Sequence, residues 1–469
     1  MKVLLVSTYE LGHQPFGLAS PAAWLAEAGA EVSCLDLAVE TLDEEAIRAA
    51  GLIAVYLPMH TATRLASTVV PRIRAFNPAA HLCFYGLYAP LNEAFLRTEL
   101  GGGTVLGGEF ESGLVSLYNR LSANGSAALE PQSEPVLSLI KQDFHVPRRE
   151  GLPPLSRYAY VEMDQDGRRT VGYTEASRGC KHLCRHCPVV PVYGGRFFVV
   201  PRGVVIADIR QQVAGGAEHI TFGDPDFFNG VGHAIRLVEE LHGQFPDLTY
   251  DVTIKVEHLL KHTHHLETLV RTGCLFVTTA VESIDDQILT ILDKGHTRDD
   301  FVRLVGLARE ANLTLSPTFI PFLPWIPPEG YLDLLRLLAD LELVDYVAPV
   351  QLSIRLLVPE GSRLLVTPEM QQHLGHIDAA ALSYQWTHPD PRMDFLHGSV
   401  HRAVEAGEAA GSSRREIFTK VWRLAHEACG LNVPDLETSE PSDAPIHVPC
   451  LSEPWYCCAE PTESQLTEI

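Results

Sequence analysis

Three cysteines follow one another closely in the sequence ASRGCKHLCRHCP. Cys180, Cys184 and Cys187 are separated by three residues and then by two. Three soft thiolates at this spacing can hold a four-iron cluster and leave one iron open for another ligand. A structural zinc site normally has four protein ligands, and His182 or His186 could supply the fourth. The spacing therefore favours an iron–sulfur cluster over zinc and over three unrelated core cysteines.

A second group of cysteines lies in the sequence PCLSEPWYCCAEP. Cys457 and Cys458 are adjacent, and Cys450 comes seven residues before Cys457. Adjacent cysteines are poor partners for an unstrained mutual disulfide. Trp455 and Tyr456 favour packing against another surface, which argues against a purely solvated tail. Three interpretations stay open: a reactive site, a local auxiliary metal site, or a tail whose thiols are incidental.

The composition limits the classes of partner. The chain has 59 acidic and 36 basic residues, a formal charge of −23, and 46% hydrophobic residues. Such a surface repels phosphate groups, so nucleic acid and anionic membranes are poor partners. No apolar stretch approaches the length of a membrane span, and MKVLLVSTYE is too short for a secretory signal. We expect a soluble, cytoplasmic protein, in which clustered cysteines are more often metal ligands or catalytic thiols.

Residues 1–120 alternate apolar strand patterns with helix patterns. This alternation predicts a doubly wound α/β domain whose ligands lie beyond the carboxyl ends of parallel strands. Residues 121–155 are rich in Pro, Ser, Gly and charge, which is typical of a linker. The run GGGTVLGG lacks a complete dinucleotide fingerprint and is interpreted as a turn. The expected strands are 2–6, 31–37, 51–57 and 81–87.

The alternation resumes over residues 156–365, the segment that contains the three closely spaced cysteines. One strand before these cysteines and five after them predict a six-stranded partial barrel. Residues 366–440 show helix patterns, and residues 441–469 form the tail that contains the second cysteine group. The later strands are expected at 219–224, 250–256, 275–282, 313–320 and 347–357.

The cysteine run, with YGGRF after it, resembles the radical S-adenosylmethionine (radical SAM) superfamily. HITFGDPDFFNG, GCLFVTTAVESIDDQILTILDKGHT and SIRLLVPEGS extend the resemblance. It implies that the open iron chelates S-adenosylmethionine and that an electron from the cluster splits this cofactor. It also implies cofactor contacts by Asp224 at the amino group, Glu282 and Ser283 near the ribose, His186 at the adenine and Arg355 at the carboxylate. The alternative for the polar residues is a structural role at strand ends.

The amino-terminal segments PFGLASPAAWLAEAGAEVSCLDL, NPAAHLCFYG and GGEFES resemble the cobalamin-binding-type domain of many radical SAM enzymes. Cobalamin is therefore implied as a further cofactor. The Asp-x-His-x-x-Gly element that ligates cobalt in other cobalamin proteins is missing, and His13 has the wrong spacing from Glu10. Many relatives bind cobalamin without that histidine and others keep the fold only as a scaffold, so both interpretations stay open.

The ending CCAEP is similar to that of a radical SAM family known by this tail, in which some members carry selenocysteine at the position of Cys458. A selenolate is rarely a plain structural ligand, so the resemblance implies a reactive group. Cys450, Cys457 and Cys458 could together hold trivalent arsenic, and radical SAM enzymes of organoarsenical biosynthesis provide a precedent.

We therefore predict a radical SAM enzyme, most simply a transferase, that acts on a small molecule and receives electrons from a donor such as flavodoxin or ferredoxin. The sharpest hypothesis is carbon–arsenic bond formation. The alternatives are a cobalamin-dependent methyl transfer or rearrangement on an organic molecule and, more remotely, a non-catalytic metal-binding or sensing module. A tRNA substrate is disfavoured by the acidic charge and by the lack of a basic terminal domain.

Overall fold

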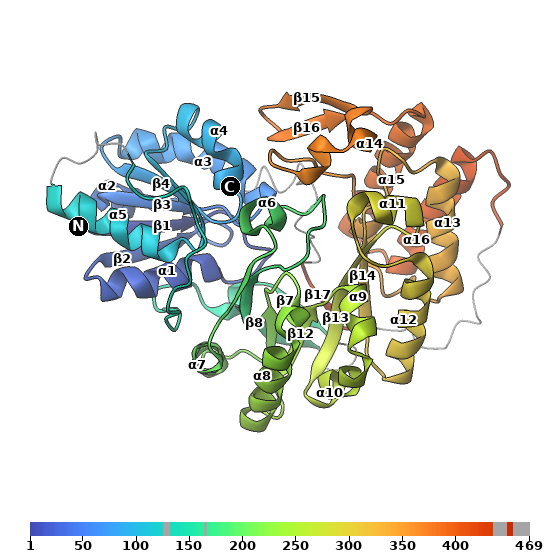
Figure 1. The fold of residues 1–469 in the computed structure, drawn as a ribbon, viewed down its shortest axis with the longest axis horizontal. Coiled ribbons are helices and arrows are strands. Elements are labelled where there is room, and N and C mark those ends of the chain that lie inside the picture. The colour runs from blue at the N-terminus through green and yellow to red at the C-terminus, as the bar shows by residue number, and fades with distance from the viewer. Residues whose placement is uncertain (125–131, 164–166, 435–447, 454–469) are drawn as a thin grey trace.

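The computed structural model describes residues 1–124, 132–163, 167–434 and 448–453. Within these ranges the chain forms two large sheets built mainly of parallel strands, with their covering helices. A mostly helical region follows, and it contains the antiparallel pair β15 (Leu374–Asp378) and β16 (Ser383–Trp386) (Figure 1). No helix in these ranges has both the length and the apolar composition that crossing a membrane requires.

The amino-terminal sheet is parallel throughout. Its strands are β1 (Lys2–Ser7), β2 (Glu31–Asp36), β3 (Leu52–Tyr56), β4 (His81–Tyr85), β5 (Thr104–Gly108) and the short β6 (Leu137–Ser138). The strand order is β2-β1-β3-β4-β5-β6, and β3 and β4 are buried along their whole length. Strands covered on both faces need such continuous apolar runs, and the expected doubly wound domain is confirmed.

Helices cover both faces of this sheet. Leu18 of α1 (Phe16–Glu27) and Leu114 of α5 (Glu111–Asn124) belong to one hydrophobic core. The second core contains apolar residues of α2 (Glu44–Ala49), α3 (His60–Phe76) and α4 (Glu93–Thr98). Because the helices cover the faces of the sheet, a ligand can reach it at the carboxyl ends of the strands, where the loops begin.

The second sheet is the partial barrel. Its parallel strands are β8 (Arg168–Thr174), β11 (His219–Phe222), β12 (Thr249–Thr253), β13 (Cys274–Glu282) and β14 (Leu315–Phe319). Two antiparallel strands, β7 (Tyr160–Glu162) and β17 (Cys450–Leu451), extend the β8 edge. One hydrophobic core runs from this sheet through α7 (Arg202–Ala214), α8 (Val231–Gln244), α10 (Leu266–Arg271), α12 (Arg298–Glu310) and α13 (Pro328–Asp340) to α15 (Pro391–Ala409) and α16 (Arg414–Ala428).

The strand predicted at 347–357 is wrong. Residues Pro349–Leu352 form a 3₁₀ helix, and only one parallel bridge, between Phe322 and Arg355, marks the sixth barrel position. Pro349 has no N–H group for a sheet ladder and suits the first turn of a helix. The tail supplies an unexpected strand instead, because β17 pairs with β7 at the opposite edge.

A buried arginine from the segment between the two sheets ties them together. Arg149 donates from Nε and Nη2 to the two carboxylate oxygens of Asp208 on α7, at 2.7 and 2.8 Å. It also donates to the Gln14 side chain beyond β1 and to the Tyr173 carbonyl on β8. A buried guanidinium with several partners holds the two sheets in a fixed relative position. Losing one of these partners would leave a buried charge unpaired.

We expect the replacement Asp36→Asn to change how stability depends on pH. Burial raises the pKa of Asp36, at the carboxyl end of β2, from 3.8 to about 6, although Tyr158 donates a hydrogen bond to it at 2.8 Å. The folded state therefore binds this proton more tightly, so the wild type loses stability relative to the variant as pH rises from about 4 to 7. Over the full range, the free energy of unfolding of the wild type falls by about 3 kcal/mol relative to that of the variant.

Urea unfolding of both proteins at several pH values between 4.5 and 7.5 measures this difference. The amide of the Asp36→Asn variant keeps an acceptor oxygen for Tyr158, so the variant isolates the ionisation from the hydrogen bond. A stability difference that stays constant over this pH range would contradict the prediction.

Candidate active site between the two sheets

A cavity of about 360 Å³ lies where the carboxyl ends of both sheets face each other. Its lining includes Leu11 and Met59 from loops of the amino-terminal sheet and Thr253 and Glu282 from barrel strands. This volume is in the range of small-molecule sites, and strand ends are where open α/β sheets bind ligands.

All three clustered cysteines line this cavity. Cys180 and Cys184 are buried thiols outside any disulfide, and Cys187 is half-buried. Their loop follows β9 (Ser177–Gly179), which pairs with β10 (Phe197–Val199). Gly179 has φ +73°, and a Cβ there would lie 2.5 Å from the Arg196 carbonyl oxygen, so the loop start needs glycine.

The thiols fit the ligand set of an iron–sulfur cluster. Burial raises the pKa of Cys180 to about 11, so a metal is needed to hold it as a thiolate. Asn229 lies beside Cys180. Its Oδ1 accepts the Lys181 N–H at 3.2 Å and lies 3.7 Å from the Cys180 sulfur.

His186, Glu282 and Lys294 form a charged group in the cavity wall. One oxygen of Glu282 lies 3.1 Å from His186 Nε2 and 3.3 Å from Lys294 Nζ. Burial alone would raise the pKa of Glu282, but Lys294 and His186 lower it to about 2. Glu282 also ends β13 with φ +68°, a backbone angle that is rare outside glycine. The site thus holds a permanent carboxylate, which is an acceptor for donor groups of a ligand.

Asp224 lines the cavity directly after β11. Its carboxylate accepts the Ala176 N–H at 2.8 Å and the Ser177 O–H at 2.5 Å. Burial raises its pKa to about 7, against the lowering by these two hydrogen bonds. Asp224 therefore fastens β9 to β11 and shapes the cavity wall at the same time.

The structure places two predicted cofactor contacts outside the cavity lining. Ser283 lines a separate, small cavity near Tyr331. Arg355 donates to Asp394 at 2.7 Å and to the Trp386 carbonyl at 2.8 Å, and its guanidinium lies 3.7 Å from the centre of the Trp386 ring. Both terminal nitrogens of Arg355 thus have partners among the residues that follow the barrel.

The tail reaches the cavity from the barrel edge. Cys450 is half-buried in β17 and pairs with Glu162 of β7. Leu451 and Glu453 line the cavity, and the Tyr9 hydroxyl donates to Glu453 Oε1 at 2.7 Å. Cys457 and Cys458 lie outside the described residues.

The cavity lining also includes charged residues that the sequence interpretation did not assign to it, among them Glu10, Glu175, Lys255 and Lys294. Burial raises the pKa of Glu10 well above its usual range, and the neighbouring Glu175 adds to this shift. The sequence held a weak indication of these residues, because Glu10 follows the end of β1 by three residues and Lys255 follows the end of β12 by two. Position after a strand alone does not separate such residues from ordinary loop residues.

A single buried guanidinium joins carboxylates from both sheets directly before the cysteine loop. Arg178 Nη1 lies 2.6 Å from Glu111 and 3.7 Å from Glu109, and Arg178 Nε lies 2.7 Å from Glu175. Only 6% of the Arg178 side chain is exposed. Burial raises the pKa of Glu109 to about 7, although Arg178 lowers it.

The curated relatives resemble one part of the chain. A tRNA-2-methylthio-N(6)-dimethylallyladenosine synthase of Chlorobium chlorochromatii is 26% identical over 164 residues, which is 32% of this chain and 34% of that protein. The enzyme of the same name from Sphingopyxis alaskensis is 22% identical, over 37% of this chain and 41% of its own length. The chain thus spans about a third to two fifths of the relatives it matches.

Solved structures match over more of the chain. The radical S-adenosylmethionine methyltransferase TsrM from Kitasatospora setae aligns with 73% of this chain and 71% of its own at 20% identity and a TM-score of 0.58. The cobalamin-dependent S-adenosylmethionine radical enzyme OxsB aligns with 87% of this chain and 67% of its own at 15% identity and a TM-score of 0.65. These likenesses show that this chain has the same overall fold as the two solved structures.

Residues 174–338, which run from the end of β8 to α13 and contain all three clustered cysteines, match the radical SAM superfamily. The cofactors of that superfamily are a 4Fe–4S cluster and S-adenosylmethionine, and the thiols in the cavity wall fit the cluster. Residues 174–338 are therefore a radical SAM domain, which indicates that the chain is an enzyme.

Proposed function

We propose that this enzyme is a transferase that acts on a small molecule in the cavity between the sheets, with the cysteines of the tail meeting the substrate. One observation carries the proposal: Leu451 and Glu453 line the same cavity as the cluster cysteines, so the tail reaches the reaction space. The acidic charge of −23 favours a small molecule over the tRNA that the names of the curated relatives state.

The protein's own residues have distinct tasks in this proposal. Cys180, Cys184 and Cys187 would hold the cluster, which with S-adenosylmethionine supplies reductive cleavage of a carbon–sulfur bond. Asp224 and Glu282 would bind donor groups of S-adenosylmethionine, since both line the cavity beside the cysteines. The apolar wall from both sheets keeps water away from reactive species.

Trivalent arsenic is the substrate that we propose for the tail thiols. Arsenic prefers sulfur ligands, and Cys450 lies three residues before Glu453, which contacts the cavity. Cys457 follows Glu453 by four residues in the sequence. In this proposal Cys450, Cys457 and Cys458 hold the arsenic. One electron from the cluster would split S-adenosylmethionine into methylthioadenosine and an aminocarboxypropyl radical; addition of this radical to trivalent arsenic and return of one electron to the cluster would give a pentavalent carbon–arsenic product.

Cobalamin-dependent transfer to an organic molecule is the second candidate. The aligned OxsB structure has aqua-cobalamin bound, and Leu11, Met59, Leu87 and Tyr88 give this cavity an apolar wall on the side of the amino-terminal sheet. This apolar wall would suit the face of a corrin ring whose cobalt receives no ligand from the protein. His13 also lines the cavity, but its ring stacks on Tyr173 with centroids 4.8 Å apart.

The test uses the full chain, purified without oxygen, loaded with iron and sulfide, and reduced by dithionite with S-adenosylmethionine, with and without arsenite. Products are identified by mass spectrometry. We expect methylthioadenosine and an arsenic-bearing amino acid only with arsenite, and a loss of at least about 100-fold in this product for Cys457→Ser/Cys458→Ser. Cys429→Ser, which changes a half-buried cysteine after α16, serves as the matched control and should keep the product.

Other outcomes are equally clear. Release of 5′-deoxyadenosine that does not respond to arsenite would overturn the arsenic substrate. Product that appears only after cobalamin is added would support the second candidate. Unchanged turnover in the Cys457→Ser/Cys458→Ser variant would remove the tail thiols from the reaction.

A further inference from the structure

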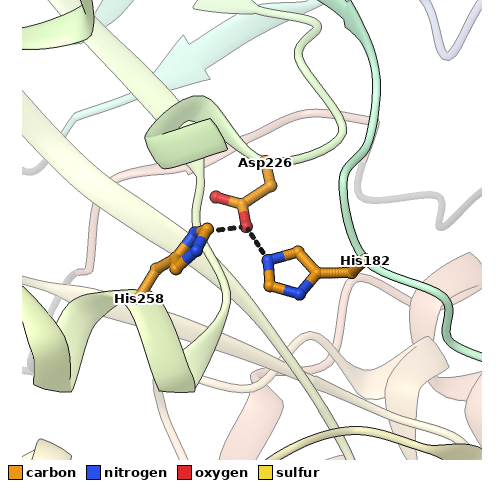
Figure 2. A group of neighbouring side chains, drawn as sticks. All are labelled: His182, Asp226 and His258. Atoms are coloured by element: carbon orange, nitrogen blue, oxygen red, sulfur yellow. Dashed lines mark ion pairs between the residues drawn. The ribbon is translucent and has the colours of Figure 1, made fainter. Parts of the chain in front are cut away.

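We propose that His182, Asp226 and His258 bind one divalent transition-metal ion, Zn²⁺ or Fe²⁺, at a site separate from the three cluster cysteines. The three side chains come from different segments: the cysteine loop, the loop after β11, and α9 (Val256–Lys261) after β12. Figure 2 shows that they converge on one point. One donor atom from each lies within 4.8 Å of the other two.

The distances suit a common ion. Asp226 Oδ2 lies 2.7 Å from His258 Nδ1 and 3.3 Å from His182 Nε2 (Figure 2). Ligand atoms placed tetrahedrally around zinc at about 2.0–2.1 Å lie about 3.3 Å from one another. Small shifts of these side chains would therefore place an ion between all three atoms.

These donor atoms face one another without well-directed hydrogen bonds. Asp226 Oδ2, His258 Nδ1 and His182 Nε2 are all buried, and none has a hydrogen bond of acceptable geometry with the described residues. The exposed fraction of the side chain is 0% for Asp226 and 2% for His258. The three atoms contact one another at 2.7 and 3.3 Å without well-directed hydrogen bonds, and a cation at their centre would satisfy all three.

A hydrogen bond orients Asp226, and a carboxylate lies near the second nitrogen of His182. Asp226 accepts the Phe228 N–H with its other oxygen, Oδ1, at 3.0 Å, which leaves Oδ2 for the site. Glu257 Oε2 lies 3.8 Å from His182 Nδ1, on the ring nitrogen that does not face Asp226. A carboxylate next to the second nitrogen of a ligating histidine is the usual outer partner in such sites.

The donor set indicates the class of metal. Two imidazole nitrogens and one carboxylate oxygen are typical of Zn²⁺ and of Fe²⁺, and they leave at least one coordination position for water or another ligand. His182 lies between Cys180 and Cys184 in the chain. A bound ion would therefore fasten the cysteine loop to the ends of β11 and β12, independently of the iron–sulfur cluster.

The test separates this site from the cluster. The full chain with Cys180, Cys184 and Cys187 all replaced by alanine cannot form the cluster and offers no thiol site for zinc in that loop. After anaerobic incubation with Zn²⁺ or Fe²⁺ and removal of the excess, metal analysis should find about one ion per chain. Adding Asp226→Asn, which keeps the acceptor for Phe228, should reduce this to below about one tenth.

A matched control guards against adventitious binding by histidines. His264→Ala removes an exposed histidine close to α9 and should leave the metal content unchanged. If the triple cysteine variant does not fold, the same comparison is made in the chain with its cluster, where zinc is counted separately from iron. Equal metal content with and without Asp226→Asn, or binding of neither ion, would overturn the proposal.

Discussion

Replacing Cys184 by alanine is expected to abolish the cleavage of S-adenosylmethionine. Cys184 is buried in the cavity wall together with Cys180, and both belong to the loop that β9 and Asn229 hold in place. Even an outer partner of a metal ligand changes metal affinity or activity by about 10–100-fold, and loss of a direct ligand should exceed this. Iron and sulfide content, visible absorption and product release all measure the effect.

Cys429→Ala provides the comparison for Cys184→Ala. Cys429 is half-buried at the end of α16 and does not line the cavity, so its replacement should keep both cluster and turnover. A Cys184→Ala protein that keeps four irons per chain and wild-type turnover would show that other residues hold the cluster. Zinc without iron in the reconstituted wild type, lost in Cys184→Ala but kept in Asp226→Asn, would support the zinc alternative for the cysteine loop.

Replacing Arg178 by methionine is expected to destabilise the contact between the two sheets more than any surface change. The substitution leaves Glu109, Glu111 and Glu175 without the buried cation that faces all three. Removing one partner of a buried ion pair usually costs about 3–5 kcal/mol. Methionine keeps much of the apolar contact with Phe16 and Phe110, whose rings lie 5.6 Å from the guanidinium carbon.

The loss in the Arg178→Met variant should depend on pH. Burial already raises the pKa of Glu109 to about 7 while Arg178 lowers it, so removing Arg178 raises it further. The carboxylates can then take up protons as pH falls, and the variant should regain part of its stability between pH 8 and pH 5.5. Urea unfolding of the cluster-free chain measures this change.

Arg298→Met is the control for Arg178→Met. Arg298 pairs with Asp333, and 37% and 45% of these two side chains are exposed. An exposed pair contributes about 0–1 kcal/mol, so this variant should unfold close to the wild type. Equal destabilisation by the two substitutions would contradict the importance of the buried arginine.

Continuous apolar strands made most of the fold predictable. β3 and β4 are buried over five residues each, so their composition alone identifies them. The prediction failed where composition and backbone chemistry conflict, because the apolar run at 347–357 contains Pro349, which starts a 3₁₀ helix. β17 could not be predicted, since two residues carry no periodicity and their pairing depends on β7 far away in the sequence.

The candidate site shows a similar division. Local spacing reveals Cys180, Cys184 and Cys187 as candidates, because three thiols lie within eight residues. His182 and His258 are 76 residues apart, and only the fold brings both to Asp226. Arg355 shows the reverse case: a polar residue near an expected strand end finds partners elsewhere, in Asp394 and Trp386, which the sequence does not reveal.

The pairing of β17 with β7 has a consequence for the order of assembly during protein synthesis. β7 leaves the ribosome early, but its partner Cys450–Leu451 is made about 290 residues later. The barrel strands β8 to β14 can pair while this edge still lacks its last strand. Because Leu451 and Glu453 complete the wall between the sheets, the reaction space stays accessible until that point. We therefore expect the cavity of a nascent chain to lack this part of its wall until residues 450–453 have been made.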